Sequence, residues 1–117
     1  MGTLLYGTPP SGFEMDDRLL GHLKPVIVSK LRRGEAFLLS WDTSLQDGSG
    51  RWSLWVHPSI PLQFRFAGNR PPALNREWLD ALNLAAGSAD GLRVVPEPGV
   101  APTTGGAQIT VRRPSAT

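Results

Sequence analysis

The chain has 117 residues, of which 40% are hydrophobic, and this length fits one globular domain with a modest core. It contains no cysteine, which excludes disulfides, thiolate metal sites and cysteine nucleophiles. The formal net charge is only +2, although arginine outnumbers lysine ten to two. GC-rich coding explains such a bias, but arginine is also the better residue for phosphate contacts and for stacking on bases.

The N-terminal stretch MGTLLYGTPP has neither a basic region nor a long apolar run. We therefore expect no signal peptide, and no segment approaches the roughly 20 apolar residues of a membrane span. The expected location is the cytoplasm.

The first elements form a hairpin followed by a helix. Residues 3–6 predict a strand, the Gly/Pro cluster at 7–12 a turn, and residues 13–15 the partner strand. Asp16 and Asp17 open a helix as capping acids, and Gly34 ends it. We expect Pro25 to cause a kink or a short break in this helix, but not to end it. His22 is assigned to the solvent side, off the apolar stripe, without a metal-binding role. The stripe consists of Leu19, Leu20, Leu23, Val26, Ile27 and Leu31.

Three strands are predicted in the middle of the chain, at 35–42, 51–57 and 62–67. The polar loop 42–50 joins the first two as a long hairpin connection. Its Gly48-Ser49-Gly50 run lacks the Lys-Ser/Thr of a phosphate-binding loop. Pro58 and Pro61 cannot donate to a ladder, so the chain turns a corner between the second and third strands.

The remaining elements are a second helix and a short strand. Asn75 is the expected N-cap of a helix that Gly87 and Ser88 end, and residues 92–95 form the strand. Residues 1–97 are then a single domain, and residues 98–117 a flexible Pro/Gly/Ala/Thr-rich segment. Ile109 to Val111 are not expected to add an edge strand. The predicted fold class is α+β, in the order β-β-α-β-β-β-α-β, with an antiparallel sheet and two helices packed on one face.

Alternation divides the three middle strands into two faces. One face is wholly apolar and should meet the helices: Phe37, Leu39, Trp41, Trp52, Leu54, Val56, Leu62, Phe64 and Phe66. The other face is mixed. Three interpretations of it remain open: cover by the chain itself, a protein interface, or single-stranded nucleic acid bound by stacking and cations. The predicted binding face comprises Arg51, Trp55, His57, Arg65 and the nearby Arg70.

The sequence contains no catalytic motif. Only His22 and His57 are bases near neutral pH, and neither a G-x-S-x-G elbow nor an H-E-x-x-H helix occurs. We therefore predict no catalytic, cofactor-binding or metal-binding residue, and no cofactor.

Several long segments resemble a family of short actinobacterial proteins of unknown function. They are MGTLLYG, DDRLLGHL, KLRRGE, SWD, WVHPSIPLQFRFAG, RPPALNREWLDALN and GLRVVPEPG, in order over roughly residues 1 to 99. Some members carry the label ATP-dependent DNA ligase. That activity needs a Lys-x-Asp-Gly nucleophile motif, whereas Lys24 is followed by Pro-Val-Ile and Lys30 by Leu-Arg-Arg.

The sequence therefore favours a small non-enzymatic binding module without a membrane partner. We expect it to act through self-association or a protein partner. The alternative is a nucleic-acid-binding accessory protein that uses the basic, aromatic sheet face.

Overall fold

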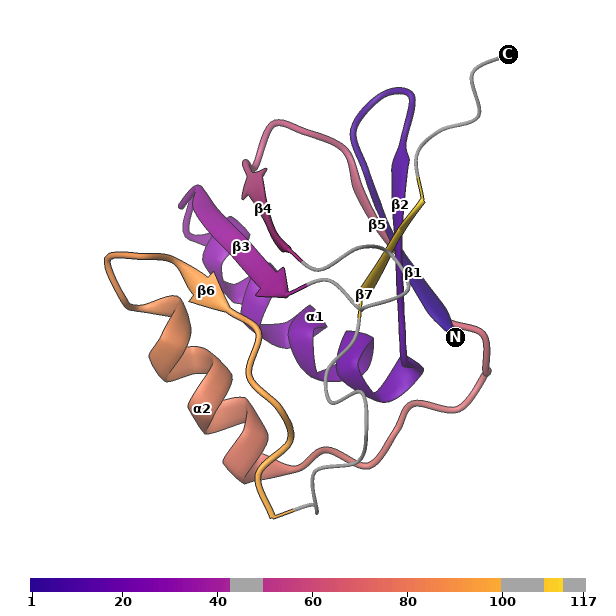
Figure 1. The fold of residues 1–117 in the computed structure, drawn as a ribbon, viewed down its shortest axis with the longest axis vertical. Coiled ribbons are helices and arrows are strands. Elements are labelled where there is room, and N and C mark those ends of the chain that lie inside the picture. Colours follow the sequence, from indigo (N-terminus) through magenta and orange to yellow (C-terminus); the bar gives the residue numbers. More distant parts are fainter. Residues whose placement is uncertain (43–49, 100–108, 113–117) are drawn as a thin grey trace.

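The computed structural model describes residues 1–42, 50–99 and 109–112. Within these residues two helices accompany two small sheets, so the α+β class and the expected order of elements are confirmed (Figure 1). No helix in the described part of the chain is long and apolar enough to cross a membrane.

The first sheet has the strand order β5-β1-β2-β7 and is antiparallel throughout. Strands β1 (Gly2–Tyr6) and β2 (Ser11–Met15) form the expected N-terminal hairpin, with Leu4 opposite Phe13. Strand β5 (Leu62–Arg65) pairs with the other edge of β1, where Phe64 lies opposite Leu4. These three inward-facing side chains contribute to one core.

The second sheet has the order β4-β3-β6. Strands β3 (Phe37–Asp42) and β4 (Arg51–Val56) are antiparallel, with Leu39 opposite Leu54. The predicted hairpin is thus confirmed, and most of its loop, residues 43–49, lies outside the described residues. The short strand β6 (Leu92–Arg93) runs parallel to β3, so this sheet is mixed.

The prediction that the three middle strands lie side by side was wrong for β5. The corner at Pro58 to Pro61 carries the chain out of the second sheet, and β5 joins β1 instead of β4. The Tyr6 hydroxyl links the two sheets there. It donates to the carbonyl of Trp55 and accepts the His57 amide at 3.1 Å.

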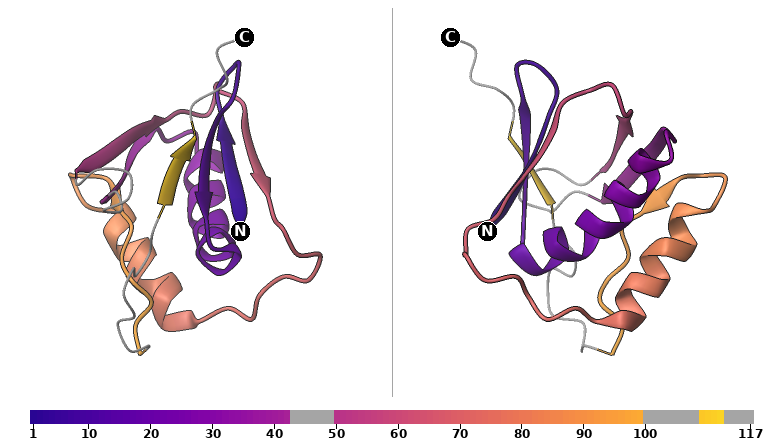
Figure 2. Two further views of the ribbon diagram at one scale, coloured as in Figure 1. Left: turned by 45° about the vertical axis from the view of Figure 1, so that its right-hand side comes forward. Right: turned by 180° about the vertical axis from the view of Figure 1, so that it is seen from behind.

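Helix α1 (Asp17–Arg32) lies against both sheets and beside the second helix, as the two views of Figure 2 show. It continues through Pro25. Asp16 occupies the N-cap position but makes no side-chain capping bond, contrary to expectation. Asp17 bonds instead to a distant loop, accepting from the amides of Ala67 at 3.1 Å and Gly68 at 2.9 Å.

Helix α2 (Arg76–Ala86) begins at the predicted cap, where the Asn75 side chain accepts from the Trp78 amide at 3.4 Å. Trp78, Leu82 and Ala86 face α1 and β6 and are buried. Both helices therefore contribute to one core, together with the inner faces of the two sheets.

Strand β7 (Ile109–Arg112) corrects the prediction that Ile109 to Val111 add no strand. It pairs antiparallel with β2, with Ile109 opposite Met15, and Ile109 is buried. Burial of the apolar Ile109 side chain is favourable, and the edge of β2 that does not pair with β1 is available for the backbone of β7. The segment predicted to be flexible also includes residues 98 and 99, where the Pro98 carbonyl accepts from the Asn75 side chain at 3.3 Å. Its residues 100–108 and 113–117 lie outside the described residues.

Candidate functional site

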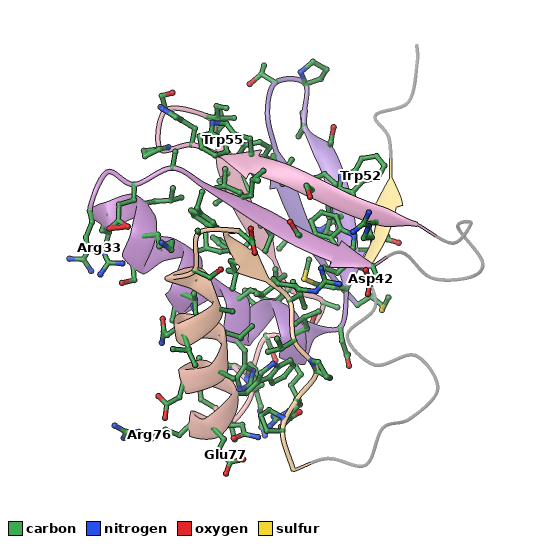
Figure 3. All side chains as sticks on the ribbon, turned by 60° about the vertical axis from the view of Figure 1, so that its left-hand side comes forward. Arg33, Asp42, Trp52, Trp55, Arg76 and Glu77 are labelled. Atoms are coloured by element: carbon green, nitrogen blue, oxygen red, sulfur yellow. The ribbon has the colours of Figure 1, made fainter. Side chains whose placement is uncertain are left out.

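The outer face of β3 and β4 exposes the aromatic side chain singled out in the sequence. Trp55 is 54% exposed, and its cross-strand neighbour Leu38 is 37% exposed. The described residues therefore leave about half of the Trp55 side chain open. In Figure 3, Trp55 lies near one end of β4, whereas Trp52 of β4 and Asp42 of the neighbouring β3 lie near the other end.

The five predicted binding residues do not share one face. Arg51 and Trp55 are both on the outer face of β4, whereas Arg65 belongs to β5 in the other sheet. Arg70 lies in the loop before α2, and His57 in the corner after β4. The predicted binding face required β5 to pair with β4. Because these strands belong to different sheets, Arg65 is separated from Arg51 and Trp55.

His57 stabilises the turn between β4 and β5. Its Nδ1 accepts from the Ser59 hydroxyl at 2.7 Å and from the Ser59 amide at 3.1 Å, and its carbonyl accepts from the Ile60 amide. A serine–histidine pair can form a nucleophile and its base, but a third group must then orient the ring. No described residue bonds to His57 Nε2, so the pair is explained by the turn.

His22 is fully buried, and the prediction of a solvated side chain was wrong. Its Nδ1 donates to the Arg18 carbonyl at 2.7 Å, and its Nε2 accepts from the Asn75 amide at 2.8 Å. The ring stacks on Trp78 with centroids 4.5 Å apart. Both ring nitrogens are occupied by the fold, which leaves neither free for a metal or a substrate proton.

A charged network continues outward from this histidine. Arg18 binds Glu97 through two hydrogen bonds, at 2.8 and 2.7 Å, and also donates to the carbonyl of Ala73. The Asn75 side-chain amide donates to the same carboxylate at 2.9 Å. The Arg18 bonds, with that of Asn75, lower the pKa of Glu97 to about 2. The network fastens residues 95–98 to both helices.

A hollow with a volume of about 660 Å³ borders α1 and the loop that leads to α2. Small-molecule sites are commonly of this size. We call it the α1 groove. Its walls are mostly apolar: α1 supplies Gly21, Lys24, Pro25 and Val28, and the loop supplies Phe66, Arg70, Pro72 and Leu74.

The shape of the α1 groove depends on a glycine inside a helix. A Cβ at Gly21 would stand 2.7 Å from Cγ of Pro72, so only glycine lets the loop come this close. Asp17 holds the start of the same loop through the amides of Gly68 and Ala67, and these bonds lower the pKa of Asp17. The groove is therefore formed by fixed contacts.

The charges of the α1 groove are positive. The described residues that line it include Lys24 and Arg70 but no carboxylate, and neither cation forms a salt bridge within the described part of the chain. The Lys24 ammonium lies 5.7 Å from the centre of the Phe66 ring, a cation–π distance. Leu74, at the mouth, is 56% exposed.

Arg70 was predicted from the sequence, but the groove was not. A signal was present, because a glycine followed four residues later by a proline is costly within a helix and calls for a packing reason. His22 was also recoverable: it lies three residues after Leu19 and four before Val26, and these spacings put all three on one helix face.

Together the fold and groove define a small α+β protein in which two sheets pack with a central helix bordered by a cationic, apolar groove. The chain belongs to the family of the DUF7882 domain, a domain of unknown function whose model matches residues 1–97. An uncharacterised family is what the sequence resemblance implied. No curated protein and no solved structure matches the chain.

Proposed function

We propose that this protein is a non-enzymatic interaction module in the cytoplasm, which acts by contact with a protein partner or with a second copy of itself. The observation that supports the proposal is the α1 groove. It combines an apolar lining with exposed Leu74 and two cations that have no salt-bridge partner among the described residues.

The groove also meets a physical requirement for binding. Association costs less when the receptor surface is already in its bound shape. Here Pro72 is packed against Gly21, and the loop is bonded to Asp17. Prolines at positions 71 and 72 restrict the loop further. A partner would therefore order little of the loop on binding.

The test is a nuclear magnetic resonance titration of ¹⁵N-labelled protein, in two arms. In the first, the protein is diluted from about 1 mM to 20 μM to detect self-association. In the second, an 18-residue amphipathic helical peptide of Leu, Ala and Gln is added. We expect shifts concentrated at Lys24, Val28, Phe66 and Leu74 in one arm. Unchanged spectra in both arms would refute the proposal.

A second candidate function is nucleic-acid binding, which the exposure of Trp55 favours. The exposed indole offers a stacking surface, and Arg51 supplies a cation on the same face at the other end of β4. Arg65 and Arg70 lie on other elements, so β4 alone would supply the contact. Binding of single-stranded DNA at low salt, lost in Trp55→Ala but kept in Trp52→Phe, would support this function. Absence of a mobility shift would count against it.

A further inference from the structure

We infer that the partner of the α1 groove is an acidic amphipathic helix that lies along α1. The inference rests on the proposed function and adds the chemistry and shape of the partner.

The length of the surface indicates a helix. A second hollow of about 430 Å³ adjoins the groove along α1 and shares Pro25 and Val28 with it. The second hollow extends to Arg32 and Arg33 at the end of α1. From Gly21 to Arg32 the helix spans about 17 Å, at ~1.5 Å per residue. A partner helix of roughly 11 residues has the same length, with apolar anchors recurring every three or four residues.

The charges around this surface call for carboxylates. Lys24 and Arg70 lie at one hollow and Arg32 at the other, and none of the three forms a salt bridge with a described residue. Arg33 is different, because it pairs with Glu35 at 2.8 Å. Three cations at the border of an apolar surface are complementary in charge to a helix that carries acidic residues on both sides of a row of leucines.

The apolar floor distinguishes a peptide from a nucleic acid. Pro25, Val28 and Leu74 give anchor positions for aliphatic side chains. Single-stranded nucleic acid needs exposed rings for base stacking. Among the described residues, Phe66 is the only aromatic one that lines the groove, and Lys24 lies over its ring. The surface is therefore better suited to leucine anchors than to bases.

The experiment compares three fluorescein-labelled 18-residue peptides by fluorescence anisotropy with the full chain. They share one pattern of Leu and Ala, and their polar positions are all Glu, all Gln or all Lys. We expect the Glu peptide to bind at least tenfold more tightly than the Gln peptide, and the Lys peptide not to bind. The affinity for the Glu peptide should fall as salt rises.

Two double variants locate the contact. Lys24→Ala with Arg70→Ala should weaken binding of the Glu peptide about tenfold, since each exposed charge contributes a fraction of the energy. The matched control, Arg51→Ala with Arg65→Ala, removes two cations elsewhere and should leave the affinity within twofold. All four side chains are on exposed residues, so both variants should fold.

The outcomes separate the two proposals. If the Gln peptide binds as tightly as the Glu peptide, the acidic partner is wrong and the interaction module stands. If no peptide binds and the chain does not self-associate, both the acidic partner and the proposed interaction module are refuted. Equal loss in both double variants would refute the location. If an oligothymidine 12-mer binds more tightly than the Glu peptide and displaces it, the ligand of the groove is a nucleic acid and the acidic-helix proposal is refuted.

Discussion

Replacing Gly21 with alanine sets two effects of opposite sign against each other. Alanine in a helix interior is favoured over glycine by about 1 kcal/mol. The added Cβ, however, would lie 2.7 Å from Cγ and 3.2 Å from Cδ of Pro72. A proline ring cannot rotate away, and overpacking of this kind costs about 1–3 kcal/mol. We expect Gly21→Ala to lower the free energy of unfolding by roughly 1 kcal/mol.

Urea unfolding of a double-mutant cycle measures the clash by itself. In the Pro72→Ala background the ring is gone, so Gly21→Ala should raise stability by about 1 kcal/mol. The coupling between the two positions is then about 2 kcal/mol. Ser29→Ala on the exposed side of α1 is the control for helix propensity and should gain about 0.5 kcal/mol. An equal gain from Gly21→Ala in both backgrounds would show that the loop does not depend on glycine.

Three further substitutions test the polar contacts. His22→Ala leaves a cavity and a buried Asn75 amide without its acceptor, and we expect a loss of about 3 kcal/mol in thermal or urea unfolding, whereas a surface histidine would cost under ~0.5 kcal/mol. Glu97 has a pKa of about 2 in the fold, below the unfolded value of ~4.3. Its contribution to stability is therefore present above pH ~4.5 and is lost as the pH falls toward 2. Glu97→Gln should therefore be less stable than wild type at pH 7, with the difference shrinking through this window in urea titrations; a difference independent of pH would contradict the assignment. Tyr6→Phe removes the donor to the Trp55 carbonyl, and we expect it to lower the free energy of unfolding by about 1–2 kcal/mol. Urea unfolding should then show a lower midpoint, and an unchanged midpoint would contradict this expectation.

Alternation and helical spacing predicted the elements and most of the core. Phe37, Leu39 and Trp41 were assigned to the inner face of their strand, and all three are buried. The same reasoning could not assign strand partners, because an apolar face looks the same whichever sheet it belongs to. The partner of β5 is decided by the corner at Pro58 to Pro61 and by the Tyr6 hydroxyl, contacts between distant parts of the chain.

The candidate site was harder to predict for the same reason. Arg70 was singled out as a cation, but the groove exists only because Pro72 packs on Gly21, 51 positions earlier in the sequence. The pair of Arg18 and Glu97 is more widely separated still, by 79 positions. Two charges so far apart in the sequence leave no periodic pattern. Glu97 stands between Pro96 and Pro98, and neither neighbour indicates that it pairs with Arg18.

Strand β7 has a consequence for the solubility of the isolated domain. The family match ends at residue 97, yet the pairing of β7 with β2 lies beyond it. With β7 in place, β2 is an inner strand, and Ile109 closes the core over it. A chain cut at residue 97 would expose a row of unpaired backbone groups next to Phe13 and Met15, which is a template for pairing between molecules. We therefore expect β7 to protect β2 against aggregation, so the chain that is expressed should extend beyond residue 97.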